Sequence, residues 1–198
     1  MKKPIIAFTI ADKKNLEYFD KFQKSLRKFY TEDQLPLLLI DENKINSYRD
    51  PHFFYRATPL IAKDLLREYE TVVKCDCDQI VTGNLSHTWD STDDLAVVFN
   101  SNPRELKIQL WDIHPLSYVN CGYVVMKSEK FVNHWFNLCM SPHFQNYQFR
   151  EQDLLNIMIA YGDYKVKFLD NSNKWHGLVS KGYWPEIQLK DDKLFLPK

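Results

Sequence analysis

The segment that most constrains this chain is the run from Thr71 to Val81, which reads TVVKCDCDQIV. Its first residues are rich in the β-branched and apolar types that favour a buried strand. Two carboxylates, Asp76 and Asp78, follow directly and are one residue apart. Carboxylates held this close repel each other unless a proton or a cation lies between them. The segment therefore predicts a strand that ends at a divalent cation.

The type of ligand narrows the choice of cation. At the end of a strand, Asp76 and Asp78 can converge on one ion while Cys77 turns away. Carboxylate oxygens prefer hard cations such as magnesium, manganese or calcium. Such an ion bridges phosphate oxygens and stabilises charge on a departing phosphate. For this motif taken alone, two ordinary acids in a solvated loop are the competing interpretation.

The residues before this segment indicate an α/β domain. Residues 4–10 (PIIAFTI) and 35–40 (LPLLLI) are short apolar runs, as buried parallel strands would show. Residues 15–30 lie between them and carry apolar side chains at helical spacing. Strand, helix and strand in this order predict a parallel sheet.

Three aspartates follow the expected strands of this sheet. In open α/β sheets, ligands gather at the carboxyl ends of the strands. Asp12, Asp41 and Asp76 each come directly after such an end. We therefore expect the functional site at that edge of the sheet.

The later chain continues the alternation of helices and strands. We expect a polar loop at 42–54, a helix from Thr58 to Tyr69 with Thr58 as N-cap and Pro59 at its first position, a short helix or turn at 84–89, a strand at 95–99, a polar loop at 100–107, a strand at 118–126, a helix capped by Ser128 and stopped by Pro142, a helix at 150–161 ended by Gly162, and a strand at 164–168.

Composition excludes several classes of protein. The chain has 198 residues, 44% of them hydrophobic, which suits one packed domain. Lys and Arg balance Asp and Glu at 26 each, so no net field indicates nucleic acid or an anionic membrane as a partner. The start reads as a strand rather than a signal peptide, and no apolar stretch is long enough to cross a membrane. We expect a cytoplasmic protein, in the host cytoplasm if the chain is viral.

The cysteines do not predict a metal site or a disulfide framework. Cys75, Cys77, Cys121 and Cys139 form no C-x-x-C pair. Cys75 and Cys77 point to the same face of the expected strand and cannot easily bridge to each other. Buried free thiols in a reducing compartment are the expected state.

Six features follow one another in a fixed order along the chain. They are the early strand PIIAFTIAD at residues 4–12, the pair Tyr55-Arg56 ahead of a helix, the acidic motif followed by IVTGNLSHTWD at residues 80–90, the triplet Asn120-Cys121-Gly122 in a strand, EQDLLN at residues 151–156, and His176-Gly177 with Lys181 ahead of Trp184.

In this order the six features resemble GT-A-fold glycosyltransferases of family 8 and its relatives, the glycogenin and lipopolysaccharide-galactosyltransferase type. The likeness extends over most of the chain. It implies a GT-A fold, which is a Rossmann-like α/β nucleotide-sugar transferase fold whose mixed, mostly parallel central sheet is flanked by helices. It also implies one domain over residues 1–198, which is compatible with being one module of a longer chain.

The resemblance implies a metal and diphosphate site. Asp76 and Asp78 would bind manganese or magnesium, with His176 as the third protein ligand, and a nitrogen ligand favours manganese slightly. Arg56 would hold a phosphate or the donor sugar, and Lys181 would neutralise the β-phosphate. The residues beside these ligands in the motifs, Cys77 and Gly177, are expected in the same nucleotide-sugar site.

The resemblance also implies the contacts of the nucleoside. Backbone groups of Thr9, Ile10 and Ala11 would read the uracil, and Asp12 would lie near the ribose. For any one of these residues, an ordinary strand end is the competing interpretation.

The donor sugar would meet a separate group of residues. Asn120 would hydrogen-bond the sugar, and Gly122 would allow close backbone approach. Glu151, Gln152 and Asp153 would face the sugar as the candidate catalytic residues. Acids at a helix start also complement the helix dipole, which accounts for part of their presence without catalysis.

The implied reaction is transfer of a hexose or deoxyhexose from a UDP-sugar to a glycan, glycoprotein or other hydroxyl acceptor. Glucose, galactose and rhamnose all fit the pattern. With retention of configuration, no protein nucleophile is evident, and the leaving phosphate would deprotonate the acceptor. With inversion, Glu151 or Asp153 is the candidate general base.

The chain departs from the family pattern near its end. The spacing from His176 to Lys181 is one residue shorter than the pattern, and KGYW stands where Lys-Pro-Trp is usual. Because of this departure, Lys181 matches the phosphate-binding lysine of the family less well than the other residues match their motifs.

Three alternatives remain beside the glycosyltransferase interpretation. A haloacid-dehalogenase-type phosphatase also has a D-x-D after a strand, but on its first strand, and it has a later G-D-x-x-x-D that this chain lacks. A sugar-phosphate nucleotidyltransferase needs a Gly-rich loop with Arg where ADKKN stands at residues 11–15. A non-catalytic nucleotide-sugar-binding module would not need to retain Asp76, Asp78, Glu151 and His176.

Overall fold

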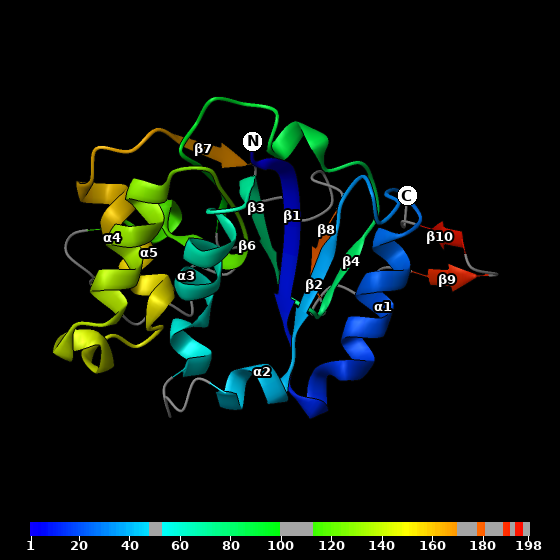
Figure 1. The fold of residues 1–198 in the computed structure, drawn as a ribbon, viewed down its shortest axis with the longest axis horizontal. Coiled ribbons are helices and arrows are strands. Elements are labelled where there is room, and N and C mark those ends of the chain that lie inside the picture. Colours follow the sequence, from blue (N-terminus) through cyan, green and yellow to red (C-terminus); the bar gives the residue numbers. More distant parts are fainter. Residues whose placement is uncertain (48–52, 100–112, 170–177, 181–187, 191–192, 196–198) are drawn as a thin grey trace.

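A computed structural model describes residues 1–47, 53–99, 113–169, 178–180, 188–190 and 193–195 (Figure 1). Its centre is a six-stranded sheet in the order β2-β1-β3-β6-β5-β7. The strands are β1 (Lys3–Ile10), β2 (Leu37–Ile40), β3 (Tyr69–Cys75), β5 (Leu95–Phe99), β6 (Val119–Met126) and β7 (Val166–Leu169).

The sheet is mixed and mostly parallel, as expected. β1 pairs in parallel with β2 and β3, and β5 pairs in parallel with β7. β6 is antiparallel to both its neighbours, β3 and β5. The start of β6 therefore lies at the edge where β1, β2 and β3 end.

Helices cover both faces of this sheet (Figure 1). They are α1 (Leu16–Leu26), α2 (Glu42–Ser47), α3 (Phe53–Leu65), α4 (Glu129–Cys139) and α5 (Glu151–Tyr161), with short 3₁₀ turns at Lys13–Asn15, Ser86–Thr88, Pro115–Ser117 and Pro142–Asn146.

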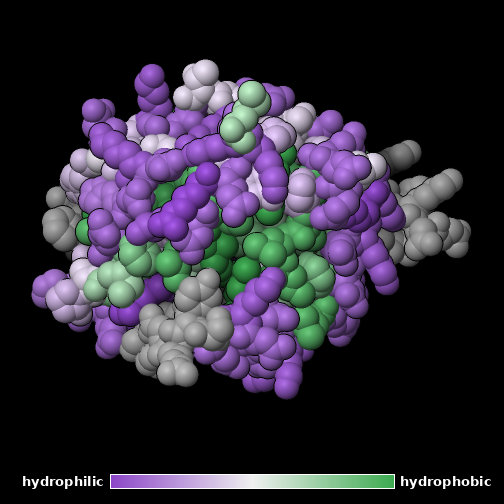
Figure 2. All heavy atoms as spheres, in the orientation of Figure 1, coloured by the Kyte–Doolittle hydropathy of each residue, from purple (hydrophilic) through white to green (hydrophobic). Residues whose placement is uncertain are grey.

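Successive strand residues face two separate hydrophobic clusters, because side chains alternate along a strand. Phe8 packs with residues of α3, α4 and α5, whereas Ala7 packs with Phe22 and Leu26 of α1. Burial on both faces explains why the strands read as continuous apolar runs. On the face that Figure 2 shows, hydrophobic residues are visible mainly in the middle, where β1 and β2 lie.

Two helix starts differ from the expectation. The loop predicted at 42–54 is wrong over Glu42–Ser47, because these residues form α2. The Asp41 carboxylate accepts from Lys44 N at 3.0 Å and the Asp41 carbonyl accepts from Ile45 N at 2.9 Å. Ile45 packs against the core, so capping and one buried side chain stabilise a polar segment as a helix.

The second wrong start is that of α3. Thr58 is not its N-cap, because α3 begins at Phe53 and Pro59 lies inside the helix. Thr58 itself is buried in the helix, with 2% of its surface exposed. Proline favours the first helical position but does not exclude an interior one where packing holds the helix.

Helices α4 and α5 begin and end close to the expected residues, whereas α1 ends at Leu26 and not at Tyr30 as expected. Ser128 caps α4, because its side chain accepts from Phe131 N at 3.2 Å. α5 ends at Gly162, whose φ is −90°, so the glycine is not needed for a left-handed backbone. A Cβ at Gly162 would lie 2.4 Å from the Met158 carbonyl oxygen. A glycine is therefore needed here because there is no room for a side chain. The polar loop predicted at 100–107 lies outside the described residues.

Four short strands were not expected. β4 (Gln79–Val81) pairs with β8 (Leu178–Ser180), and β9 (Gln188–Lys190) pairs with β10 (Lys193–Phe195), both antiparallel.

All four cysteines are buried free thiols. In the part of the chain that the structure describes, none of the helices has the length and apolar character needed to cross a membrane.

Candidate functional site

The paired acids lie where β3 ends. Asp76 follows the last residue of β3, and Asp78 lies in the turn before β4. Asp76 N donates to Gly122 O of β6 at 2.7 Å, which ties the acidic motif to the neighbouring strand. The Asp76 side chain is 47% exposed, so it is open to a ligand.

A buried lysine contacts this carboxylate from the core side. Lys74 Nζ donates to Asp76 Oδ1 and, at 2.8 Å, to Cys121 O. Burial is the largest single effect on the pKa of Lys74 and acts to lower it. The negative charge of Asp76 and its hydrogen bond to the ammonium outweigh burial and raise that pKa above its usual range. Lys74 is therefore a permanent cation inside the site.

Gly122 lies under the other side of the same carboxylate. A Cβ at this position would stand 2.6 Å from Asp76 Oδ2 and 2.6 Å from Asn120 Oδ1. Asn120 Oδ1 accepts from Gly122 N at 2.5 Å, so the asparagine side chain folds back over the strand. Both residues of the N-x-G triplet thus lie next to Asp76.

Helix α5 is joined to the start of β6 by side-chain amides. Gln152 Oε1 accepts from Cys121 N at 2.9 Å. Asn156 Oδ1 accepts from Val119 N at 2.7 Å, and its Nδ2 donates to Val119 O at 3.0 Å. These bonds replace ladder bonds that β6 would otherwise make and direct the N-terminus of α5 toward the carboxyl edge of the sheet.

The residue before α5 has a strained backbone. Arg150 has a φ of 50°, a conformation that non-glycine residues rarely adopt. Its side chain donates to Tyr147 O at 2.7 Å, which helps to hold the turn. Such strain persists only where surrounding contacts over-determine it, and it clusters at functional sites.

Glu151 is the acid that α5 brings toward Lys74 and Asp76. In the described part of the chain, its buried Oε2 has no hydrogen-bond partner. Burial raises the pKa of Glu151 to about 8, against the lowering effects of its own backbone N–H and of Lys74. A carboxyl group with one unused oxygen and a pKa near neutrality is suited to bind a hydroxyl or move a proton.

Asp153 is bonded to the chain through both oxygens. Oδ1 accepts from the Tyr118 hydroxyl, and Oδ2 accepts from Phe149 N at 2.8 Å. The residue is fully buried, and burial raises its pKa despite these bonds. These contacts explain Asp153 as the residue that holds the first turn of α5.

The end of β1 holds the residues expected to meet the nucleoside. Thr9 is fully buried, and its hydroxyl has no hydrogen-bond partner among the described residues. Ile10 is half-buried, and Ala11 N donates to Ile40 O at 3.1 Å. Asp12 Oδ1 accepts from Asn15 N at 3.1 Å, so this side chain caps the following turn. This strand end lies at the same edge of the sheet as Asp76.

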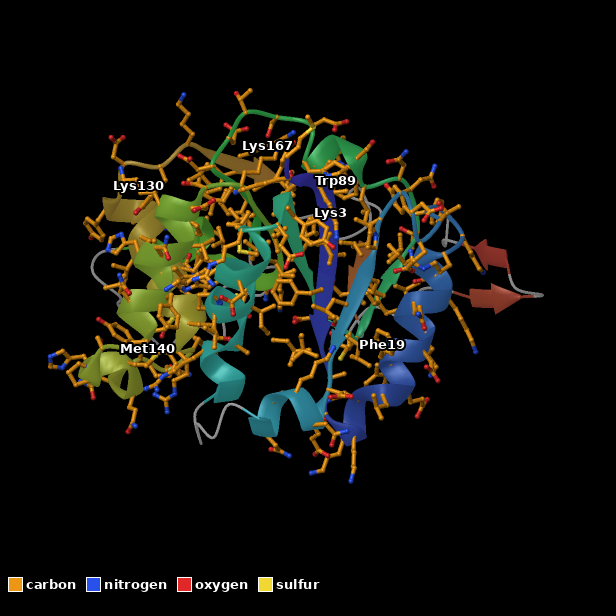
Figure 3. The ribbon with its side chains drawn as sticks, in the orientation of Figure 1. Lys3, Phe19, Trp89, Lys130, Met140 and Lys167 are labelled. Carbon is orange, nitrogen blue, oxygen red and sulfur yellow. The ribbon has the colours of Figure 1, made fainter. Side chains whose placement is uncertain are left out.

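The opposite edge has a different character. Figure 3 labels Lys3 at the amino-terminal end of β1, and the Lys3 ammonium is 5.2 Å from the centre of the Tyr69 ring. The described candidate residues Asp76, Asn120 and Gly122 lie at the carboxyl edge instead.

Arg56 lies on α3 against the Phe144 ring, with its guanidinium carbon 4.8 Å from the ring centre. Burial raises the pKa of the Cys139 thiol, and Arg56 opposes that shift, so Arg56 is also near α4. Phe144 and Cys139 thus mark the surroundings of this arginine, on the face of the sheet that α3, α4 and α5 cover.

The remaining expected ligands, His176, Gly177 and Lys181, lie outside the described residues. Ser180, which precedes Lys181 in the chain, pairs with Gln79, which follows Asp78. No group of three or more His, Cys, Asp or Glu side chains suited to a metal occurs within the described ranges.

The donor chemistry present nonetheless fits a hard cation. Asp76 and Asp78 supply two carboxylates. Because Gly122 has no side chain, it leaves Asp76 Oδ2 uncovered. Burial raises the pKa of Cys77 to about 11, so this thiol stays protonated and is a poor ligand.

Lys74 and Asn156 were missed by the sequence reasoning. Lys74 carried a usable signal, because it is the one charged residue in the apolar run before Asp76 and shares its strand face. Asn156 gave none beyond its place in the EQDLLN motif.

No family model matches the sequence, and no curated protein matches it significantly. Solved structures do match the fold. The chain aligns over 88% of its length with the glycosyltransferase GlyE of Streptococcus pneumoniae TIGR4, at 16% identity and a TM-score of 0.56, but spans only 46% of GlyE. It aligns over 83% of its length with the galactosyltransferase LgtC, solved with donor and acceptor sugar analogues, at 17% identity and a TM-score of 0.59, spanning 72% of that chain.

A third match is a glycosyltransferase involved in glycosylation of the major capsid of PBCV-1, a Chlorella-virus enzyme. The alignment covers 86% of this chain and 82% of that one, at 11% identity and a TM-score of 0.59. The TM-scores show a shared architecture, while the identities are too low to show more than the fold, and the chain therefore has the GT-A fold of these glycosyltransferases.

Proposed function

We propose that the chain is a metal-dependent glycosyltransferase. It moves a hexose or deoxyhexose from a UDP-sugar to a hydroxyl group of a glycan or glycoprotein, with retention of configuration. The fold it shares with GlyE, LgtC and the PBCV-1 enzyme supports glycosyl transfer.

One observation carries the proposal. The Asp76 carboxylate lies between the Lys74 ammonium and Gly122, at the edge of the sheet toward which α5 carries Glu151. An arrangement that only stabilised the fold would not need a half-exposed carboxylate or a buried acid with an unused oxygen.

Different residues would bind the diphosphate and the uridine of the donor. Asp76 and Asp78 would hold Mn²⁺ or Mg²⁺, with His176 completing the ligand set and Lys181 near the β-phosphate. The ion, when bound, supplies positive charge to the departing diphosphate. Backbone groups from Thr9 to Asp12 would bind the uridine, because this strand end shares the edge with Asp76.

The sugar would lie between β6 and α5. Asn120, Gly122 and Gln152 line the start of β6 and the first turn of α5. Glu151 Oε2, which has no hydrogen-bond partner among the described residues, would form a hydrogen bond with a sugar hydroxyl. Arg56 would act farther out, on a phosphate or on the sugar.

The bonding of the acidic side chains near the proposed sugar site favours retention of configuration at the sugar. Both oxygens of Asp153 are bonded to Tyr118 and Phe149, so this residue is poorly placed to serve as a base. A phosphate oxygen of the leaving group can accept the acceptor proton on the same face. Glu151 is the remaining candidate base if the reaction inverts.

The main alternatives are a D-x-D phosphatase and a non-catalytic nucleotide-sugar-binding module. A phosphatase would use Asp76 as a nucleophile and would not depend on a nucleotide. A binding module would hold UDP without turning over a UDP-sugar.

The test is release of UDP from a panel of UDP-sugars, with Mn²⁺, with Mg²⁺ and with EDTA. The proposal expects metal-dependent release from at least one UDP-hexose or UDP-deoxyhexose, lost in Asp78→Ala. Binding of UDP with no release from any sugar would favour the binding module. Release of phosphate from simple phosphate esters, without any effect of UDP, would favour the phosphatase.

A further inference from the structure

The least expected side chain in the central sheet is Lys74. It lies on β3 between Phe8 of β1 and Val124 of β6 in the strand register, and its side chain is 8% exposed. Burying an ammonium group is unfavourable unless it is paired and hydrogen-bonded. An apolar residue would fill this position at lower cost if packing were its only role.

The contacts of Lys74 fix one oxygen of one residue. Its ammonium donates to Asp76 Oδ1 and to Cys121 O. The other oxygen of the same carboxylate, Oδ2, lies where a Cβ on Gly122 would stand 2.6 Å away. The carboxylate is therefore held from one side by a cation and bounded on the other by a residue without a side chain.

This restraint matters because Asp76 is otherwise free to move. Its side chain is 47% exposed, so without a partner it would sample several rotamers in water. A half-exposed carboxylate that must present one chosen oxygen needs a fixed partner for the other.

We propose that Lys74 is a positioning residue that holds Asp76 Oδ1 so that Oδ2 is the oxygen presented to the divalent cation and the nucleotide. This inference rests on the proposed function. It adds a residue that touches neither ligand and acts only through Asp76.

The test compares Lys74→Met with a matched lysine variant elsewhere. Lys127 is suited as the control, because its ammonium donates to the backbone carbonyls of Trp89 and Ser91, away from the acidic motif. The readout is Mn²⁺ binding in the presence of UDP, followed by the electron paramagnetic resonance signal of free Mn²⁺. Thermal unfolding in EDTA reports whether each variant is folded.

Lys74→Met is expected to weaken Mn²⁺ binding by about 10- to 100-fold, as loss of a residue that orients a ligand does. Lys127→Met is expected to bind Mn²⁺ within about twofold of the wild type even if its stability falls. Lys74→Arg, which keeps a cationic donor, is expected to recover part of the loss. Should Lys74→Met not fold, Lys74→Gln replaces it with the same expectation, since it lacks the charge.

A double-mutant cycle separates positioning from general destabilisation. Gly122→Ala displaces the same carboxylate from the other side, so the two changes should not add. The double variant Lys74→Met/Gly122→Ala is expected to bind Mn²⁺ about as weakly as the weaker single variant. Additive losses would overturn the inference, because Lys74 would then act through something other than Asp76.

Measurements on the wild type separate a failure of the proposed function from a failure of the role proposed for Lys74. If the wild type binds neither UDP nor Mn²⁺, the proposed function is wrong. If the wild type binds both and folded Lys74→Met or Lys74→Gln binds Mn²⁺ equally well, the proposed function stands and the role of Lys74 is wrong.

Discussion

The carboxylate of Asp76 packs directly over the backbone of Gly122, and a Cβ on that glycine would stand 2.6 Å from Asp76 Oδ2. The two residues are brought together because β6 is antiparallel to β3, so the start of one strand meets the end of the other. The N-x-G and D-x-D motifs, more than 40 residues apart, are thus parts of one site.

Gly122→Ala is the first prediction from this contact. The added methyl group would displace a half-exposed carboxylate, which can rotate into solvent. We expect Mn²⁺ and UDP affinity to fall by about 10- to 100-fold, with a small change in the free energy of unfolding. Calorimetric titration and urea unfolding measure the two quantities.

Gly162→Ala is the matched control for that substitution. Its methyl group would meet the backbone carbonyl of Met158 at 2.4 Å, and a backbone oxygen cannot rotate away. We expect a loss of about 1 to 3 kcal/mol in stability with unchanged UDP affinity. Equal loss of UDP affinity in both variants would contradict the account of Gly122.

Tyr118→Phe tests the interpretation of Asp153 as a structural residue. The change removes the hydroxyl donor to Asp153 Oδ1, leaving a buried acceptor without that partner. The free energy of unfolding is expected to fall by about 1 to 3 kcal/mol, while UDP affinity stays the same. A tenfold loss of UDP affinity without loss of stability would mean that Asp153, or Gln152, which donates to the same hydroxyl at 3.3 Å, acts on the ligand.

The pKa of Glu151 makes a prediction about pH. Burial raises this pKa from its ordinary 4.5 to about 8, so the folded protein keeps a proton that the unfolded chain has lost in between. Stability should therefore fall as pH rises between these values, by at most about 1.4 kcal/mol per pH unit. Glu151→Gln carries no titratable group at this position and should lack this part of the decline.

Urea unfolding of the wild type and Glu151→Gln in EDTA, from about pH 5 to about pH 9, measures the difference. The stability of Glu151→Gln relative to the wild type should increase with pH across this range. Two parallel curves would contradict a protonated Glu151 in the folded protein.

His176→Ala tests the expected third metal ligand. Loss of a direct ligand should weaken Mn²⁺ binding by at least about tenfold and leave the free energy of unfolding in EDTA unchanged. His143→Ala is the control, because His143 is exposed on a short 3₁₀ turn. Equal Mn²⁺ affinity in the two variants would remove His176 from the proposed ligand set.

Local signals in the sequence were sufficient for much of the fold. The Ser128 cap of α4 and the strand Leu95–Phe99 could be predicted, because capping chemistry and apolar runs act over a few residues. The helix α2 could not, since its stability depends on the Asp41 cap and on Ile45 reaching the core. The β4–β8 pair joins two three-residue strands from distant parts of the chain, and no local pattern predicts such pairing.

The motifs of the candidate site are visible in the sequence, but their arrangement in space is not. The acidic motif, the N-x-G triplet and the start of α5 all stand out as residue patterns. Their convergence depends on the direction of β6, which periodicity does not reveal. Lys74 was missed although it is the one charged residue in its apolar run, because a lysine in such a strand is usually read as an edge or surface residue, and its two buried contacts show otherwise.

The proposed function depends above all on the acidic motif binding a nucleoside diphosphate through a divalent cation. Titration of UDP into the wild type and Asp78→Ala, each with Mn²⁺ and with EDTA, tests it most directly. We expect UDP to bind the wild type with Mn²⁺ at least about tenfold more tightly than in EDTA, and Asp78→Ala to lose that difference. UDP affinity that is the same in all four titrations, or absent from all of them, would contradict the claim.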